Sequence, residues 1–415
     1  MHLELFDILR CPYCGGRLEL VTSLPHRAAS DRIHDGILGC HCCIFPVVDG
    51  IPVLHLQPSA ITAREHVEAG RFPLALRTMI GVDDAAQAEQ FEATAANAQS
   101  TYRDVVAAMG PNFEGGYFLY RFSDPTFIVA NAVVRAVAST VLHGTRRAID
   151  ICGGSGHLTR SLMDLSTPAP VLADLFFPKV WLARRFTAPG CAPVCCDGNA
   201  PMPFVKGAFG YAMCSDAFQY IWTKRQFVGE MSRLVDDAKA GGAIVINHTH
   251  NQLTWSPSHG QPLAPAGYRD LFEQLTPHIY GEAGLFGDVV DHGRVDLSRA
   301  DSEDALNSDP ALTLVASAND AVFRAHAVTK PEGLEREFRI NPLYAIEQRG
   351  DTAELTLTFP DSAYEDEYGA CRRYLPERAS VRLADLDALA RGERPSAATD
   401  LLERRVILEL PVNYY

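Results

Sequence analysis

The chain has 415 residues, which is room for two or three domains, and a formal net charge of −14 at pH 7. Binding to nucleic acid requires a basic stripe, so this acidic balance argues against a nucleic-acid partner. Glu4 and Asp7 interrupt the first apolar stretch and no run of about 18 apolar residues follows, so we expect neither a signal peptide nor a membrane span. The 11 cysteines, several of them in apolar strands, favour a reducing cytoplasm.

Two pairs of cysteines at C-x-x-C spacing lie within residues 1–58. The four are Cys11, Cys14, Cys40 and Cys43. Two such turns are typical of a closed structural Zn²⁺ site, and a metal would add the stability that so small a core lacks. Cys42 is an alternative to Cys43 as the fourth ligand. With its apolar flanks, this segment resembles the small zinc-ribbon proteins that partner tRNA and protein methyltransferases.

Residues 59–145 are rich in alanine and helical in pattern. We expect a helical linker there. An aromatic cluster at 113–122 ends this segment just before the first strand of the next one. These aromatics either cover a bound ligand as a lid or pack against the edge of a sheet.

Short apolar runs alternate with helical patterns over residues 146–325. The strands that we expect are 148–149, 171–173, 192–194, 209–214 and 243–246. Amphipathic helices at 179–186 and 227–235 lie between them, and 311–318 predicts a last, antiparallel strand. The alternation predicts an α/β fold with a doubly wound, Rossmann-like parallel sheet, whose ligands bind at the carboxyl ends of the strands.

Polar residues follow each of the expected strands. The run Asp150-Ile-Cys-Gly-Gly-Ser-Gly156 leads into a helix, where glycines let the backbone approach a ligand and the helix N-terminus offers free N–H groups. Asp174 ends the second strand, a position suited to the two hydroxyls of a ribose. Asp197-Gly198-Asn199 follows the third strand, and Ser215 ends the fourth.

This succession of strand ends resembles the class I methyltransferases that use S-adenosylmethionine, over roughly residues 146–250. The resemblance implies that the glycine-rich turn holds the methionine part of the cofactor, Asp174 the ribose and Asp197 the adenine amino group. Glu230–Arg233 and the turn Ala240-Gly241-Gly242 match the helix and turn that precede the fifth strand of that family. The implied cofactor-binding residues are Asp150, Cys152, Gly154, Gly156, Asp174, Leu175, Asp197, Gly198 and Ser215.

Cys152 stands where the family pattern has its first glycine, and we expect altered packing there with cofactor binding retained. The alternatives are a Rossmann-like domain without a cofactor and a dinucleotide enzyme. The first turn lacks the G-x-G-x-x-G pattern that a dinucleotide enzyme would carry.

His248 and His250 follow the fifth strand and are the candidate catalytic residues, together with Tyr220 after the fourth. Their spacing places both rings on one face of a strand, and histidine has the pKa that a general base needs. Tyr220 and Trp222 are expected to line the acceptor pocket. The two histidines could instead cap the strand or hold a second metal, although the sequence shows no nearby third ligand.

Residues 326–415 contain alternating apolar and polar runs at 353–359 and 405–410, which predict a β-rich extension. This extension could shape the substrate site, form a homodimer contact or bind a partner.

The function expected from the whole sequence is methylation of a small-molecule acceptor, at oxygen or nitrogen, in secondary or sugar metabolism. The alternatives are a methyltransferase of RNA or protein that uses the ribbon for recognition, and a non-catalytic cofactor-binding scaffold. The tip Ser215-Asp-Ala-Phe218 lacks the Asn-Pro-Pro-Tyr sequence that enzymes methylating base and amide nitrogens often use.

Overall fold

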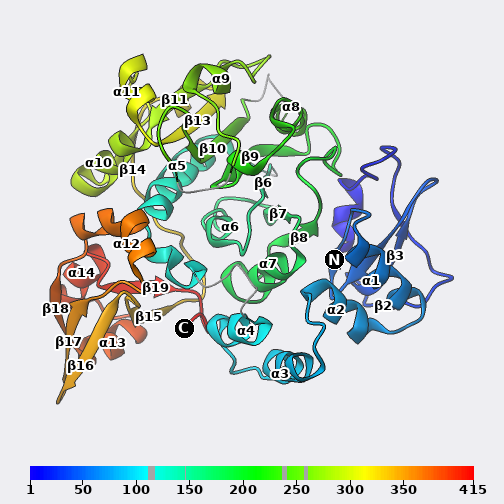
Figure 1. Ribbon diagram of the computed structural model, residues 1–415, viewed down its shortest axis with the longest axis horizontal. Helices are drawn as coiled ribbons and strands as arrows, with labels where there is room; N and C mark the ends of the chain where they lie inside the picture. The colour runs from blue at the N-terminus through cyan, green and yellow to red at the C-terminus, as the bar shows by residue number, and fades with distance from the viewer. Residues whose placement is uncertain (111–116, 145, 236–240, 257–259) are drawn as a thin grey trace.

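The computed structural model describes residues 1–415 apart from 111–116, 145, 236–240 and 257–259. The first part of the predicted aromatic cluster, Phe113–Gly116, and Ala240 of the turn before the fifth strand lie outside the described residues. Figure 1 shows the N-terminal segment and the C-terminal region on opposite sides of a central body, in blue and in orange to red. None of the helices in the described ranges has the length and hydropathy that a membrane crossing requires.

A seven-stranded sheet with the order β11-β13-β10-β9-β6-β7-β8 forms the centre of the molecule. Its five parallel strands are β6 (Arg147–Ile151), β7 (Val171–Asp174), β8 (Ala192–Cys195), β9 (Phe209–Ser215) and β10 (Ala243–His250). The strand order reverses between β6 and β9, and this switch point is where open α/β sheets bind ligands. The predicted doubly wound α/β fold is confirmed.

Two antiparallel strands extend the sheet beyond β10. The predicted strand at 311–318 is β13 (Ala311–Ser317), which pairs with β10 on one side and β11 (His278–Gly281) on the other. It is the last strand of this sheet in chain order and is antiparallel, as predicted, whereas the edge position belongs to β11.

Both faces of the sheet are buried, which is why its strands are apolar over most of their length. In β9, Tyr211 and Met213 join one hydrophobic cluster while Ala212 and Cys214 join the other. Helices α5 (Pro125–Val141) and α7 (Phe177–Leu182) pack on the first face, and α8 (Lys224–Leu234) packs on the second. Because helices cover both faces, the polar residues of the sheet lie mainly at the carboxyl ends of the strands.

The N-terminal segment is built onto the open edge of this sheet. Its strands are β1 (Glu19–Leu20), β2 (Arg27–Ala28), β3 (Ile33–Gly39), β4 (Ile44–Val48) and β5 (Ile51–Pro52). Val53 pairs with Cys195 in parallel, and the N–H of Leu54 donates to the carbonyl of Cys195 at 2.7 Å. The segment thus covers the edge of β8, an edge that would otherwise expose unpaired backbone groups.

The described residues of 59–145 are mostly helical, as predicted. The helices are α1 (Pro58–Glu68), α2 (Phe72–Ile80), α3 (Ala85–Ala96), α4 (Tyr102–Met109) and α5, with the 3-10 helix η2 (Tyr117–Ser123) before α5. Their apolar faces join the cluster on the α5 side of the sheet. The predicted division of the chain at 58, 145 and 325 stays a prediction.

The C-terminal region is β-rich, as expected, and has a hydrophobic cluster of its own. Its strands are β15 (Glu337–Ile340), β16 (Tyr344–Arg349), β17 (Thr352–Leu357), β18 (Arg378–Arg382) and β19 (Ile407–Leu410). Three helices, α12 (Ser362–Tyr368), α13 (Leu383–Ala390) and α14 (Ser396–Glu403), lie among them. The chain then returns to the central body, where the Tyr414 side chain is fully buried.

Candidate functional site

The glycine-rich turn joins β6 to the short helix α6 (His157–Arg160). A Cβ at Gly156 would lie 2.8 Å from the Cβ of Ala183, and Gly156 has a φ of 76°, so only glycine fits there. The Asp150 carboxylate is buried beneath the turn and accepts a hydrogen bond from Thr159 Oγ1 at 2.6 Å. Burial raises the pKa of Asp150 to about 7. The buried Asp150 carboxylate therefore links the end of β6 to the helix that follows the turn.

Cys152 adopts a left-handed conformation with a φ of 59°, where the family pattern has glycine. Its half-buried sulfur lies 3.3 Å from the Cβ position of Gly198, so the end of β6 packs against the loop after β8. A non-glycine residue held at positive φ stores backbone strain, which functional sites commonly retain.

Asp174 lies directly against the glycine-rich turn. Its Oδ2 accepts the N–H of Gly154 at 2.9 Å, and its Oδ1 accepts the N–H of Phe176 at 2.8 Å. Burial raises the pKa of Asp174, although both N–H groups favour its charged form. Each carboxylate oxygen has a second acceptor position, so the residue can hold the turn and still accept a hydroxyl.

Asp197 lines a cavity of about 250 Å³ between the sheet and the N-terminal segment. The opposite wall is formed by Tyr13, His55 and Leu56. Nothing in the sequence indicated that the N-terminal segment reaches the third strand end, because that contact depends on the pairing of Val53 with the edge of β8. Leu175 lies nearby, where its carbonyl accepts from the thiol of Cys195 at 3.2 Å.

The ends of β9 and β10 carry buried polar atoms without partners. Ser215 Oγ and both polar atoms of the Asn247 side chain have no hydrogen bond within the described part of the chain. Asn247 is fully buried, and an unpaired buried amide costs free energy unless water or a ligand satisfies it. These strand ends therefore resemble a binding site rather than a closed core.

His248 forms a buried pair with Glu282, the first residue of α10 (Glu282–His292). Its Nδ1 lies 2.6 Å from Glu282 Oε2, and its backbone N–H donates to Glu282 Oε1 at 2.8 Å. Burial lowers the pKa of His248, but the carboxylate of Glu282 outweighs that effect and raises the pKa to about 9. His248 is consequently an imidazolium at neutral pH.

His250 has a different environment two residues later. Its Nδ1 shares a hydrogen bond with Ser256 Oγ at 2.9 Å, which leaves Nε2 as its second ring nitrogen. Burial and the neighbouring charge of His248 lower the pKa of His250, so this ring is neutral at neutral pH. The two ring centroids are 5.6 Å apart.

The backbone that carries the two histidines differs from the regular strand that the sequence predicted. β10 has a register shift between Ile246 and Thr249, and His248 within it has a φ of 48°. This irregularity re-aims the side chains, as bulges at strand ends commonly do. The prediction of a shared face rested on a regular strand, and the strand is not regular there.

Asp216 completes a group that the sequence did not reveal. One ligand atom from each of Asp216, His248 and His250 lies within 4.8 Å of the other two, so the expectation of no third residue was wrong. Asp216 follows β9 with a φ of 54°, and its Oδ2 pairs with Nη2 of the buried Arg121 at 3.0 Å. A guanidinium on this carboxylate opposes the binding of a second cation beside it.

Tyr220 and Trp222 lie at the surface beyond β9, with exposed fractions of 47% and 72%. Their predicted role as walls of an acceptor pocket stays a prediction. Such exposure is compatible only with the rim of an open site.

Four cysteine sulfurs of the N-terminal segment form a compact group, made of Cys11, Cys14, Cys40 and Cys42. The Cys11–Cys42, Cys14–Cys40 and Cys40–Cys42 sulfurs are 3.7, 3.7 and 3.6 Å apart. Sulfurs at about 2.3 Å from a tetrahedral zinc ion are about 3.8 Å from one another, so the arrangement fits that metal.

Cys42, the alternative, takes the place in this group that the sequence analysis gave to Cys43. The N–H groups of both Cys42 and Cys43 approach Cys40 Sγ, at 3.5 and 3.3 Å, in a tight turn. Cys43 then leads into β4, and its half-buried side chain packs against a hydrophobic cluster shared with the sheet. Cys43 Sγ lies 3.4 Å from Cys42 Sγ, but the set of sulfurs that all lie within 4.8 Å of one another contains Cys42 and not Cys43.

No protein-family model and no curated protein matches this chain. Among solved structures, geranyl diphosphate C-methyltransferase from Streptomyces coelicolor A3(2), in complex with S-adenosyl-L-homocysteine, is 13% identical with a TM-score of 0.34. That alignment covers 57% of this chain and 100% of the enzyme. A Haemonchus contortus phosphoethanolamine N-methyltransferase is 15% identical, with a TM-score of 0.33, and covers 58% of this chain and 61% of its own.

The [4+2]-cyclase SpnF is also similar, at 12% identity and a TM-score of 0.33, over 45% of this chain and 79% of its own. These similarities concern the mixed α/β fold, and one such fold supports different reactions.

Proposed function

We propose that this protein is an S-adenosylmethionine-dependent methyltransferase that acts on a small-molecule acceptor. The observation that carries the proposal is the set of strained, polar residues at the carboxyl ends of β6, β9 and β10. Cys152, Asp216 and His248 all have left-handed φ values there, and Ser215 and Asn247 offer unpaired polar atoms. Strain and unsatisfied groups gathered at the switch point of a doubly wound sheet support a ligand site.

S-adenosylmethionine, when bound, supplies a methyl group to a nucleophile aligned with it. We propose that the turn from Cys152 to Gly156 faces its methionine part and that Asp174 accepts the ribose hydroxyls. Asp197, in the cavity beside the N-terminal segment, would reach the adenine. Asp174 fits this role because its charged form is already held by two N–H groups.

His250 is proposed as the general base. Its Nδ1 is occupied by Ser256, so Nε2 would take the proton from an acceptor hydroxyl or amine. His248 is proposed as a positioning residue, held by Glu282 at a ring-centroid distance of 5.6 Å from His250. The net charge of −14 leaves little attraction for a nucleic-acid acceptor, which favours a small molecule.

Replacing Asp174 by alanine is expected to weaken the binding of S-adenosylmethionine by about 1.5–3 kcal/mol, because a charge-assisted acceptor for the ribose is lost. Calorimetric titration of the purified full chain measures this loss. Asp304→Ala, in the exposed first turn of α11 (Glu303–Ser308), is the matched control and should bind as the wild type does. Equal affinity in Asp174→Ala would contradict the ribose assignment, and thermal unfolding of the variant separates lost binding from a collapsed turn.

The cysteine group is proposed to hold one structural zinc ion per chain. Cys42→Ser should lose most of the metal, whereas Cys43→Ser should keep it, because only Cys42 Sγ belongs to the group. Elemental analysis of the two purified variants beside the wild type makes the comparison. Because the zinc ion is structural, we expect its loss to lower the unfolding temperature. The affinity for the cofactor should change less. A wild type without zinc, or a Cys42→Ser variant with a full equivalent, would refute this assignment.

A further inference from the structure

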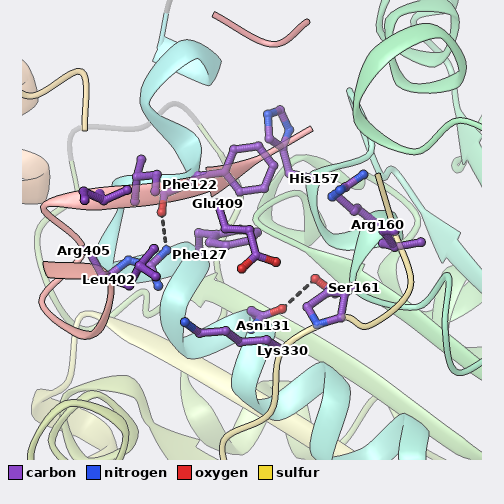
Figure 2. A pocket seen from close by; sticks show the side chains of 14 residues that line it. Phe122, Phe127, Asn131, His157, Arg160, Ser161, Lys330, Leu402, Arg405 and Glu409 are labelled. Carbon is purple, nitrogen blue, oxygen red and sulfur yellow. Dashed lines mark hydrogen bonds between the residues drawn. The ribbon is translucent and has the colours of Figure 1, made fainter. Parts of the chain in front are cut away.

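A second cavity, of about 90 Å³, lies where the central body meets the C-terminal region. Figure 2 shows its lining side chains converging from α5, from α6, from the segment at 330 and from the chain around β19. His157 and Arg160 of α6, the helix that follows the glycine-rich turn, line this cavity, and nothing in the proposed reaction uses it.

Cationic side chains outnumber acidic ones in the lining of this cavity. Arg160, Lys330 and Arg405 line it, and Glu409 is its one acidic residue within the described part of the chain. The Glu409 carboxylate is already engaged, because Oε1 accepts from Arg336 Nη1 at 2.6 Å. The cavity therefore has an excess of positive charge.

The hydrogen bonds that Arg160 and Arg405 donate go to carbonyls, and the nearby carboxylates of Glu409 and Glu403 offset only part of the positive charge. Arg160 donates to the carbonyls of Thr187 and Glu335, at 3.2 and 2.6 Å, and Arg405 donates to the carbonyl of Phe122. Carbonyls satisfy donors without neutralising a cation. Burial accordingly lowers the pKa values of Arg160, Lys330 and Arg405.

Two hydrogen-bond donors in the lining of this cavity are available to a ligand. Arg405 Nε is buried and has no partner in the described ranges of the chain, and Arg405 itself is held at a φ of 57°. Asn131 Oδ1 accepts from Ser161 Oγ at 2.6 Å, which leaves the Asn131 amide nitrogen as a donor (Figure 2). Because Arg405 Nε and the Asn131 amide both donate, a ligand that satisfies them must accept.

The other walls are apolar. Phe122, Phe127 and Leu402 line the cavity beside the cations, as Figure 2 shows. For comparison, an engineered apolar cavity of about 150 Å³ holds a benzene molecule. A volume of about 90 Å³ therefore suits a ligand of a few heavy atoms with a charged head.

We propose that this cavity binds a small organic anion, a carboxylate or phosphate on a short apolar stem, through Arg405, Lys330 and Asn131. The apolar stem would lie against Phe122 and Phe127.

A ligand bound in this cavity would also affect the glycine-rich turn through a chain of side-chain contacts. His157 of α6 lines the cavity, its Nε2 lies 2.7 Å from Tyr414 Oη, and its ring stacks on Phe118. Phe118 in turn lies 3.8 Å from the Cβ position of Gly154. A ligand that fixes α6 would thereby change the affinity of the turn for its own ligand, and the coupling would be reciprocal.

The test is calorimetric titration of the full chain, without cofactor, with three probes: acetate, butyrate and inorganic phosphate. Saturable binding of at least one probe is expected, and the probe that binds identifies the head group and whether a stem is needed. Lys330→Gln, at a surface position, should weaken binding about 10-fold or more through loss of a charge-assisted contact. Arg404→Gln is the matched control, because Arg404 pairs with Asp400 outside the cavity.

Binding of none of the three probes to a folded wild type would overturn the proposal, as would equal affinities in Lys330→Gln and the wild type. Because the titration contains no S-adenosylmethionine, its failure leaves the proposed methyltransferase function untouched. Conversely, a chain that binds the anion but no cofactor would refute only the proposed function.

Discussion

Replacing His250 by alanine is expected to lower turnover about 10²–10⁴-fold, because a general base is removed from the acceptor. The affinity for S-adenosylmethionine should hardly change, since the cofactor contacts proposed here lie on β6, β7 and β8. The pKa of His250 is lowered from the ordinary histidine value of 6.5, so this base stays neutral at pH values somewhat below 6.5. The acidic limb of the wild-type pH–rate profile should therefore lie below pH 6.5.

Initial rates of the wild type and variant, measured with an identified acceptor, test this expectation. His292→Ala is the matched control, because His292 is exposed in the last turn of α10. His250→Gln keeps a hydrogen-bonding side chain without a base, so full activity in that variant would assign an orienting role instead. Wild-type turnover in His250→Ala would contradict both roles. A loss of a second metal equivalent in that variant would show that the group with Asp216 is a metal site.

Breaking the pair between His248 and Glu282 is expected to cost about 3–5 kcal/mol of unfolding free energy at pH 6.5, because Glu282→Gln leaves a buried charge without its partner. Folding raises the pKa of His248 from 6.5 to about 9, so its contribution is complete below pH 6.5 and is lost as pH rises through 9. Folding lowers the pKa of Glu282 from 4.5, so that contribution is present above pH 4.5 and is lost as pH falls through the lowered value.

Chemical denaturation at several pH values between 6 and 9.5 measures the effect. The wild type should lose stability as pH rises through this range, and Glu282→Gln should lack that part of the slope. Glu303→Gln removes an exposed partner of Arg269 and should cost less than about 1 kcal/mol. Parallel pH profiles for the wild type and Glu282→Gln would show that the pair is not charged as described.

The sequence predicted the features that short segments determine. The turn from Asp150 to Gly156 follows from residues adjacent in the chain, and so does the alternation of strands and helices. The glycines there are required by close packing, as the contact of Gly156 with Ala183 shows. Local pattern and tertiary structure agree in this part of the molecule.

The parts that could not be predicted depend on contacts between distant residues. Glu282 is 34 residues from His248, Arg121 is 95 residues from Asp216, and Tyr414 is 257 residues from His157. Nothing in the spacing of such residues reveals that they meet. The sequence offered Cys42 only as an alternative to Cys43, because the positions of the two sulfurs depend on the folded turn.

The most direct test of the proposed function follows a labelled methyl group. The purified wild type and His250→Ala are each incubated with methyl-labelled S-adenosylmethionine and a whole extract of the cells that make the protein. Small molecules, RNA and protein are then separated and counted. We predict label in the small-molecule fraction with the wild type and little there with the variant. Label confined to RNA or protein, or no transfer in any fraction, would contradict methylation of a small-molecule acceptor.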